Sequence, residues 1–236
     1  MMCLILAAGL GSRLREVSES KPLTPVGGVP LIAHAIERAA AGGASRFVVV
    51  TGHEADRVEA FLGGLDAAVE CVRAADWNRP NGFSVLAGAE AIAGDYLLLM
   101  SDHLFEPEIV RGLLAASSQD AGVTLAVDRR LSGPLLDLDD ATKVELAEDG
   151  RIRRIGKALE RFDAIDTGIF LATPELAGAI RAAVATGGSG SLSEGVQRLA
   201  DAGRAATFDI GDANWIDVDD WRMLDLAEAL VRDGAA

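Results

Sequence analysis

The first 128 residues alternate between short apolar runs and longer segments with apolar side chains at helical spacing. An unbroken apolar run predicts a strand that is buried on both faces, whereas the helical spacing predicts an amphipathic helix. We expect strands at 2–8, 46–52, 67–73, 95–102 and 121–128, and helices at 30–43, 54–64, 85–94 and 106–117. Residues 75–84 are rich in turn-forming residues and are expected to form a loop.

Repeated strand–helix units predict a mostly parallel sheet with helices on both faces. Ligands of such sheets bind beyond the carboxyl ends of the strands. Small or polar residues occupy three of these ends, at 7–9, 51–52 and 101–102. The pattern therefore predicts an α/β fold with a ligand crevice at that edge of the sheet.

After the fifth strand the rhythm changes. Residues 141–157 are expected to form a hairpin that turns at 148–150. Thr173 is expected to cap one later helix, and Ser191 and Glu194 have the spacing of a capping box for another. The remaining elements are expected to be strands at 162–172, 204–210 and 214–220, which complete the sheet, and helices at 173–185, 189–203 and 219–233.

The composition excludes some classes of function. The 236 residues are 50% apolar, which suffices for one sizeable core, and their formal net charge is −14. A surface this acidic repels polyanions, so we expect no nucleic-acid partner, whereas divalent cations suit it. The N-terminus has no basic leader region and no apolar run reaches the length of a membrane span. We therefore expect a cytoplasmic protein without direct membrane insertion.

The two cysteines, Cys3 and Cys71, lie in predicted strands and are expected to be buried free thiols. Neither belongs to a CxxC motif or to a Cys/His cluster, so no zinc site is expected. This usage is typical of a reducing compartment.

Residues 6–22 leave the first strand through a run of small residues and then carry two cations. A dinucleotide fingerprint would need a third glycine where Leu14 stands, and a Walker A lysine would follow a glycine, whereas Lys21 follows Ser20. Successive N–H groups of small residues can still form an anion-binding nest, with Arg13 as a planar fork and Lys21 as a point charge. On these residues alone, the segment is either a phosphate cradle or a strand-to-helix turn followed by solvated charges.

Carboxylates follow two further predicted strands. Asp102 ends a buried strand, so its side chain should face the crevice. In WIDVDD (215–220), Asp217 and Asp219 point to one face if the segment is extended. Either Asp219 or Asp220 can then cap the last helix.

Several segments resemble a known family. LAAGLGSRL (6–14) and KPLTPVGGVPLI (21–32) resemble the signature of nucleoside-triphosphate sugar-1-phosphate nucleotidyltransferases. Six later segments are most similar to CTP:inositol-1-phosphate cytidylyltransferases, namely NGFSV (81–85), LMSDH (99–103), DDATKVEL (139–146), IRRIGKAL (152–159), FDAIDTGIF (162–170) and WIDVDD (215–220). The resemblance implies a GT-A-like, Rossmann-related α/β fold with a mostly parallel mixed sheet and helices on both faces. In some members this domain is fused to a membrane CDP-alcohol transferase.

The resemblance also implies site residues. It assigns catalytic roles to Arg13 and Lys21 and places Mg²⁺ on Asp102 and Asp217, two hard oxygen ligands of the kind that this ion prefers. The implied nucleotide-binding residues are Leu6, Ala7, Ala8, Gly9, Gly11, Ser12, Thr51, Gly52, Asn81 and Gly82. The implied acceptor-binding residues are Lys143, Lys157, Asp166, Thr167 and Gly168. A phosphomonoester acceptor is already mostly dianionic at neutral pH, so we expect no general base and assign His103 no catalytic role.

The implied reaction joins the CMP moiety of CTP to a phosphorylated polyol, with inositol 1-phosphate favoured, and releases pyrophosphate. Residues 1–236 would form one nucleotidyltransferase domain, with a nucleotide-binding half at 1–128 and an acceptor-binding half at 129–236. Three alternatives stay open: a phosphocholine or aminoalkylphosphonate cytidylyltransferase, a sugar-1-phosphate uridylyl- or guanylyltransferase, and a nucleotide-sensing module without turnover. A homodimer and a separate downstream membrane CDP-alcohol transferase are the protein partners to consider.

Overall fold

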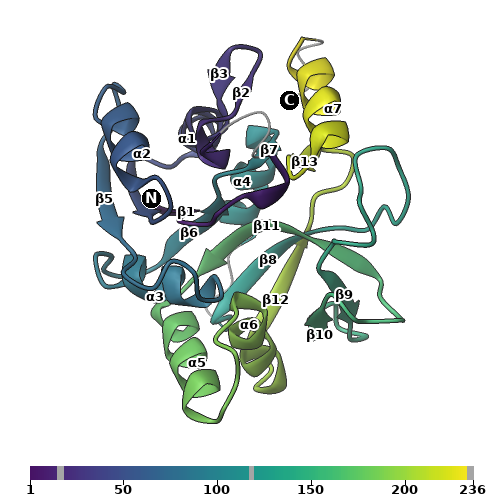
Figure 1. Cartoon of the computed structure of the whole chain (residues 1–236). Coiled ribbons are helices and arrows are strands. Elements are labelled where there is room, and N and C mark those ends of the chain that lie inside the picture. The colour runs from purple at the N-terminus through teal and green to yellow at the C-terminus, as the bar shows by residue number, and fades with distance from the viewer. Residues whose placement is uncertain (15–18, 117–119, 233–236) are drawn as a thin grey trace.

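The computed structural model describes residues 1–14, 19–116 and 120–232 (Figure 1). Within these residues, nine strands form one mixed sheet in the order β10-β9-β11-β6-β1-β4-β5, to which β8 is added beside β11 and β12 beside β8. These strands are β1 (Met2–Ala7), β4 (Arg46–Thr51), β5 (Val69–Arg73), β6 (Tyr96–Met100), β8 (Val123–Asp128), β9 (Lys143–Leu146), β10 (Ile152–Gly156), β11 (Ala164–Ala172) and β12 (Ala205–Asp209). The first four run parallel, whereas β11 is antiparallel to β6, β8 and β9.

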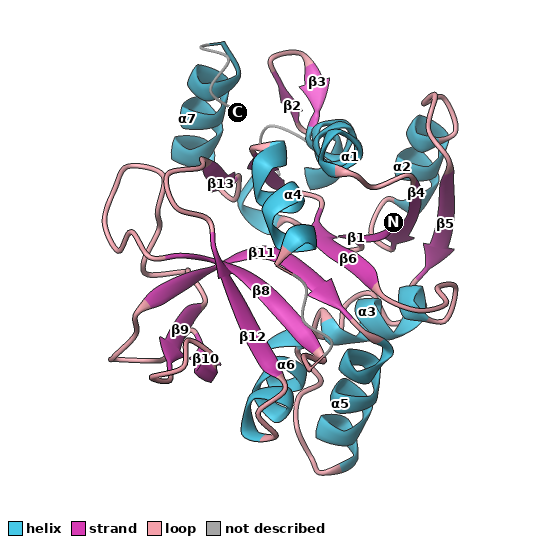
Figure 2. Ribbon diagram, turned by 180° about the vertical axis from the view of Figure 1, so that it is seen from behind, coloured by secondary structure: helices cyan, strands magenta, loops and turns pink. Residues whose placement is uncertain are grey.

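Helices cover both faces of this sheet (Figure 2). Leu4 and Leu6 of β1 pack in the core on one face, and Cys3 and Ile5 pack in the core on the other. This alternation explains why the run is apolar throughout. The helices are α1 (Leu31–Gly42), α2 (Ala55–Leu62), α3 (Gly82–Ala89), α4 (Pro107–Ala115), α5 (Pro174–Ala185), α6 (Leu192–Asp201) and α7 (Trp221–Arg232). The predicted α/β fold class is confirmed.

The start of α3 differs from the prediction. We expected a loop at 75–84, but α3 begins at Gly82 and ends at Ala89. A Cβ on Gly82 would lie 2.2 Å from the carbonyl oxygen of Gly190, so the absence of a side chain lets this first turn pack closely against the loop before α6. Tertiary packing thus overrides the turn preference of this stretch.

Two small two-stranded sheets stand outside the large sheet. β13 (Trp215–Asp217) pairs antiparallel with β7 (His103–Phe105). The expectation that 214–220 completes the large sheet is therefore wrong, because the chain leaves that sheet after β12 and pairs with the segment that follows β6. β2 (Pro25–Val26) and β3 (Val29–Pro30) form the second small sheet, a hairpin that was too short for a periodic pattern to reveal. A third apolar core joins α7 to this region.

Helix ends follow local rules more closely. The Thr173 hydroxyl accepts a hydrogen bond from the Glu175 N–H at 3.2 Å, and Ser191 forms the predicted capping box with Glu194. Asp220, rather than Asp219, caps α7, because its Oδ1 accepts a hydrogen bond from the Met223 N–H at 2.9 Å. Asp219 is thereby left to face the cleft.

Cys3 is buried, but Cys71 is exposed, so the expectation of two buried thiols is wrong for Cys71. The reason is that β5 is an edge strand of the sheet, covered on fewer sides than β1. Of the helices that the structure describes, none has the length and apolarity to cross a bilayer. Ser117 and Asp233, the predicted last residues of two helices, lie outside the described residues.

Candidate active site

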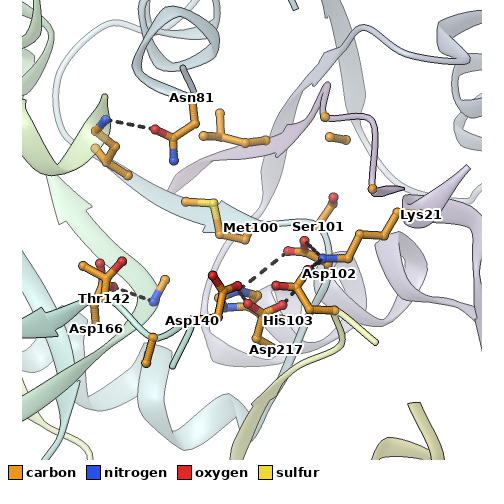
Figure 3. A pocket seen from close by; sticks show the side chains of 18 of the residues that line it. Lys21, Asn81, Met100, Ser101, Asp102, His103, Asp140, Thr142, Asp166 and Asp217 are labelled. Carbon is orange, nitrogen blue, oxygen red and sulfur yellow. Dashed lines mark hydrogen bonds and ion pairs between the residues drawn. The ribbon is translucent and has the colours of Figure 1, made fainter. Parts of the chain in front are cut away.

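A cleft of about 490 Å³ opens at the carboxyl ends of β1 and β6 and beside β11 and β13 (Figure 3). This is the edge at which an open α/β sheet binds its ligands. The loop after β1 lines one part of the cleft, together with Lys21 in the short 3-10 helix η2 (Lys21–Leu23). Carboxylates from β13, β11 and the turn after β6 line another part.

The loop after β1 is shaped by its small residues. Gly11 has a positive φ of 58°, and a Cβ there would lie 2.4 Å from the Cβ of Lys21. Glycine therefore permits both the turn and the passage of the lysine stem. Gly9 has open space around it, so a ligand can approach its backbone closely.

Lys21 lies at the centre of an acidic cluster. Its Nζ is 2.5 Å from Asp102 Oδ2 and 3.7 Å from Asp217 Oδ1, and it forms an ion pair with Asp219. Burial acts to lower the pKa of Lys21, but the three carboxylates outweigh burial and raise it. Lys21 is therefore a fixed positive charge, and only 8% of the residue is exposed to solvent.

His103 is a second buried cation beside the same carboxylates. Its Nδ1 donates a hydrogen bond to the Thr167 carbonyl at 2.8 Å, and its Nε2 lies 3.5 Å from Asp217 Oδ2. Burial alone would lower the pKa of His103, but Asp217 and Asp102 raise it to about 9. A Cβ on Gly168 would lie 2.4 Å from this ring, so a residue with a side chain would clash with His103 at this position. A group with this pKa is mostly protonated at neutral pH, and the assignment of no general-base role to His103 stays a prediction.

The carboxylates respond differently to this surrounding charge. Burial would raise the pKa of Asp217, but His103 and Lys21 outweigh it and hold the pKa well below its ordinary value. Burial and the neighbouring Asp217 charge raise the pKa of Asp219 to about 6. Asp217 is thus the more persistent anion of the two.

The donor atoms fit a divalent cation. Ligand atoms of Asp102, His103 and Asp217 lie within 4.8 Å of one another. Asp217 Oδ1 is buried and has no hydrogen-bond partner among the described residues. Mg²⁺ prefers such carboxylate oxygens and not a protonated imidazole, so Asp102 and Asp217 are the residues that would hold it.

A carboxylate bridge links the two sides of the cleft. Asp140 accepts hydrogen bonds from the Arg13 guanidinium and from Lys157 Nζ, each at 2.6 Å. Burial would raise the pKa of Asp140, but the bonds from Lys157 and Arg13 lower it to about 2. Arg13 also donates to Asp219 at 2.6 Å. Two cations that the sequence assigned to different substrates are therefore held by one anion.

Asp166 projects from β11 into the cleft (Figure 3). Its Oδ1 accepts a hydrogen bond from the Gly168 N–H at 2.8 Å. Burial raises the pKa of Asp166 to about 6. Thr167, the next residue, is fully buried and donates to the Ala126 carbonyl, so its side chain points away from the cleft.

Most of the predicted site residues come together in this cleft. Those that line it are Leu6, Ala7, Ala8, Gly9, Gly11, Arg13, Lys21, Asn81, Asp102, Lys157, Asp166, Gly168 and Asp217. Predicted residues among the described ones that lie outside the lining are Thr51, Gly52, Gly82, Lys143 and Thr167. Nothing is described of the Ser12 side chain.

The five outside the lining have local partners. The Thr51 hydroxyl donates to Glu59 at 2.7 Å. Gly52 packs against Trp77 and the Ala8 carbonyl. Lys143 donates to the Lys157 carbonyl at 3.3 Å. The assignment of these residues to the nucleotide and acceptor stays a prediction.

The cleft also contains residues that sequence reasoning did not assign. Asp140 and Asp219 carry charge, and both lie inside segments that carried the family resemblance, which was the available signal. Trp77 and Arg79 line the cleft near Asn81 without such a signal, whereas Ser84 lies inside the segment 81–85 that carried the resemblance. Other unassigned lining residues are Pro22, Met100, Ser101, His103, Leu135, Leu136, Asp137, Ala141, Thr142, Phe170, Leu192, Ser193, Trp215 and Met223.

Residues 3–199 match the family described as the MobA-like NTP transferase domain, and the chain therefore belongs to this family. A Rubrobacter xylanophilus protein named "Bifunctional IPC transferase and DIPP synthase" is 36% identical over 236 residues, covering 98% of this chain and 52% of that protein. The chain thus spans about half the length of that relative. A Streptomyces rubellomurinus protein named "CMP-5'-(3-aminopropyl)phosphonate synthase" is 36% identical over 153 residues, covering 62% of this chain and 24% of that protein.

Among solved structures, the inositol-1-phosphate CTP transferase from T. maritima superposes with a TM-score of 0.84 at 26% identity. The match covers 100% of this chain and 97% of that one. The resemblance stated from the sequence, with its GT-A-like fold, is confirmed.

Proposed function

We propose that this chain transfers the CMP moiety of CTP to the phosphate of a phosphorylated polyol, with inositol 1-phosphate favoured. The observation that carries the proposal is the pairing of opposite charges in one cleft: Lys21 lies among three carboxylates, with Arg13 close by. The names of the relatives from Rubrobacter xylanophilus and T. maritima supply the substrate class.

The proposed reaction is a single in-line displacement. An oxygen of the acceptor phosphate bonds to the α-phosphorus of CTP, the α–β phosphoanhydride bond breaks, and pyrophosphate takes the electron pair. The acceptor is already mostly dianionic, so no proton needs to move, in keeping with the cationic His103. No covalent enzyme intermediate is needed.

The residues of the chain act by position and charge. The backbone from Ala8 to Gly11 and the side chains of Arg13 and Lys21 bind the triphosphate and offset the charge that develops on pyrophosphate. Lys157 holds the phosphate of the acceptor, and Asp166 accepts hydrogen bonds from the hydroxyl groups of the polyol. Asp102 and Asp217 would hold Mg²⁺, which when bound polarises phosphoryl oxygens and orients the reacting groups.

One alternative acceptor has specific support. The cleft contains Trp215 and Phe170, and aromatic rings together with carboxylates suit an ammonium group. The name of the Streptomyces rubellomurinus relative points the same way. We therefore keep an aminoalkylphosphonate or phosphocholine as the second candidate acceptor.

A substrate panel tests both candidates. The purified chain is incubated with each of the four ribonucleoside triphosphates and with inositol 1-phosphate, phosphocholine, an aminoalkylphosphonate or a hexose 1-phosphate, and pyrophosphate release is measured with Mg²⁺ or with a chelator. We expect release with CTP and inositol 1-phosphate, and none after chelation. Turnover only with another pair would show that the proposed acceptor or the proposed nucleotide base is wrong. No turnover with any pair would favour a nucleotide-sensing module.

Removal of the Asp140 carboxylate is expected to strengthen CTP binding, whereas most substitutions in a binding site weaken it. Asp140→Asn should strengthen CTP binding about two- to fivefold, because phosphate no longer competes with this carboxylate for a half-exposed Arg13, and such pairs stabilise by up to about 1 kcal/mol. Calorimetric titration with CTP measures the change. Asp139→Asn is the matched control, since it removes the same charge from an exposed neighbour. Weaker CTP binding in Asp140→Asn alone would contradict competition.

The raised pKa of Asp166 predicts that its ionised carboxylate lowers the stability of the fold although the acceptor needs it. The folded state binds the Asp166 proton up to about pH 6, above the ordinary range of an aspartate, so the free energy of unfolding falls as the pH rises from about 4 to 6. Asp166→Asn removes this loss and keeps an acceptor for the Gly168 N–H. We expect the variant to be more stable than the parent by about 1–3 kcal/mol at about pH 8 and equal to it at about pH 4.

Urea unfolding at the two pH values measures this difference. The same variant should raise the KM for a polyol acceptor without changing the KM for CTP, because Asp166 lies on the acceptor side of the cleft. Equal gains in stability at both pH values would show that ionisation of Asp166 is not the cause.

A further inference from the structure

A polar network beside the cleft, buried at Asp128 and partly exposed at Arg130, joins the end of β8 to β13. Asp128, the last residue of β8, accepts hydrogen bonds from Arg130 Nε and from Trp215 Nε1, each at 2.9 Å. Arg130 also donates to the carbonyl oxygens of Asp212 at 3.2 Å and Ala213 at 2.7 Å. These carbonyls belong to the connection between β12 and β13, so one ion pair contacts both β8 and the segment that leads into β13.

The network connects β13, which carries Asp217, with β8, the neighbour of the strand that carries Asp166. In the register of β8 with β11, Asp128 lies opposite Ile165, the residue before Asp166. Trp215 lies two residues before Asp217 in β13. Since β13 pairs with β7 and is not a member of the large sheet, no strand ladder ties it to β8. The hydrogen bonds of Asp128 and Arg130 connect β8 to β13 where backbone pairing does not.

The chemistry of the link suits a positioning role. Asp128 is 2% exposed, and both of its carboxylate oxygens accept hydrogen bonds from Arg130. The Arg130 side chain is 39% exposed, so the ion pair adds little net stability, but the planar guanidinium fork restricts the relative orientation of the groups that it joins. Trp215 also lines the cleft, and its ring lies 5.9 Å from that of His103. A displacement of this strand would therefore reach the site.

We propose that Asp128 and Arg130 are positioning residues that set the distance between Asp166, on the acceptor side, and Asp217, on the metal side. The inference rests on the proposed function, in which an acceptor held at Asp166 must meet a phosphoryl group held near Asp217. Misplacement of reacting groups by about 1 Å costs about 100-fold in rate. The β7–β13 ladder pairs Asp217 with His103 independently of this network, so the metal-binding carboxylates themselves should stay together.

The test uses two variants of Arg130 and one control. Arg130→Lys keeps the charge beside Asp128 but loses the planar fork that reaches Asp212 and Ala213. Arg130→Met removes the charge as well. Arg204→Met is the matched control, because Arg204 pairs with Glu175 at 2.5 Å and precedes the register pair Ala205–Val123 at the opposite end of the β8–β12 ladder.

We expect Arg130→Lys to lower kcat about 10-fold and Arg130→Met about 10- to 100-fold, with the KM for CTP and the Mn²⁺ affinity measured by EPR both within about twofold of the parent. Arg204→Met should leave kcat unchanged. If both Arg130 variants keep the kcat of the parent at temperatures below their Tm, the pair is merely structural and the proposal is overturned. A loss of Mn²⁺ affinity that accounts for the loss of kcat would also overturn it.

Hydrogen exchange of the Trp215 indole provides a readout without turnover. In ¹H–¹⁵N spectra, this N–H should exchange slowly in the parent and rapidly in Arg130→Met, because its acceptor Asp128 is no longer held. Unchanged slow exchange would contradict the network. If the parent shows no turnover with any pair of the substrate panel, the proposed function fails. The exchange result, and the Asp166–Asp217 separation in a crystal structure of Arg130→Met, would then still decide whether Arg130 positions these strands.

Discussion

Lys21→Ala is expected to lower kcat about 10²–10³-fold, the loss that follows removal of one preorganised charge-assisted donor. Lys21 is buried, and its ammonium contacts Asp102 and Asp219. Removing it takes away the charge that offsets the leaving pyrophosphate and leaves the carboxylates with less compensation. The variant should therefore unfold at a lower temperature without metal, and Mg²⁺ should raise its Tm more than that of the parent.

Steady-state kinetics with CTP and the acceptor, together with thermal unfolding, check this prediction. Lys21→Met is the companion variant, because it keeps most of the stem that packs against Gly11 and removes only the charge. Both variants should lose similar activity. Near-normal turnover in Lys21→Met would show that the charge of Lys21 has no part in the mechanism. If Lys21→Ala were impaired at the same time, the role of Lys21 would be packing of its stem.

Asp217→Asn is expected to lower the rate of transfer about 10³-fold at saturating CTP, because metal polarisation of a phosphoryl oxygen is worth several kcal/mol. The buried Oδ1 of Asp217 has no hydrogen-bond partner among the described residues and lies 3.7 Å from Lys21 Nζ, so this oxygen is available to bind a metal ion. Mn²⁺ affinity measured by EPR should fall in parallel with the rate. The pKa of His103 should also fall from about 9, since Asp217 raises it.

Asp219→Asn is the matched control for Asp217→Asn. It removes the same charge from the same segment, but Asp219 already pairs with Lys21 and Arg13 and has a pKa raised to about 6. We expect less than a tenfold change in rate and an unchanged Mn²⁺ affinity. Equal effects of the two substitutions would show that the cluster acts only through its total charge, and would remove the specific metal role of Asp217.

The structure bears out those sequence predictions that rest on local chemistry. Apolar runs at 2–8 and 46–52 became β1 and β4, because a strand covered on both faces needs apolar side chains throughout. The caps at Thr173 and Ser191 formed as predicted, because each needs only a hydroxyl and a nearby N–H. The edge of the sheet that holds the cleft also followed from the order of strands and helices.

Predictions failed where a distant segment decided the outcome. The early start of α3 depends on the close approach of Gly190 to Gly82, and the pairing of β13 depends on β7. The exposure of Cys71 depends on which strand became the edge. Local preference is worth a fraction of a kcal/mol per residue, so a few long-range contacts outweigh it.

The sequence by itself determined the fold class, the family and the edge of the sheet where Arg13, Lys21 and Asp102 would gather, because strand burial, turn chemistry and motif spacing are written in neighbouring residues. Tertiary structure alone decided which charged and polar groups meet. The bridge from Asp140 to Arg13 spans 127 positions, and Asp128 meets Trp215 across 87. Coulombic and hydrogen-bond energies depend on distance in space, which the order of residues along the chain does not give.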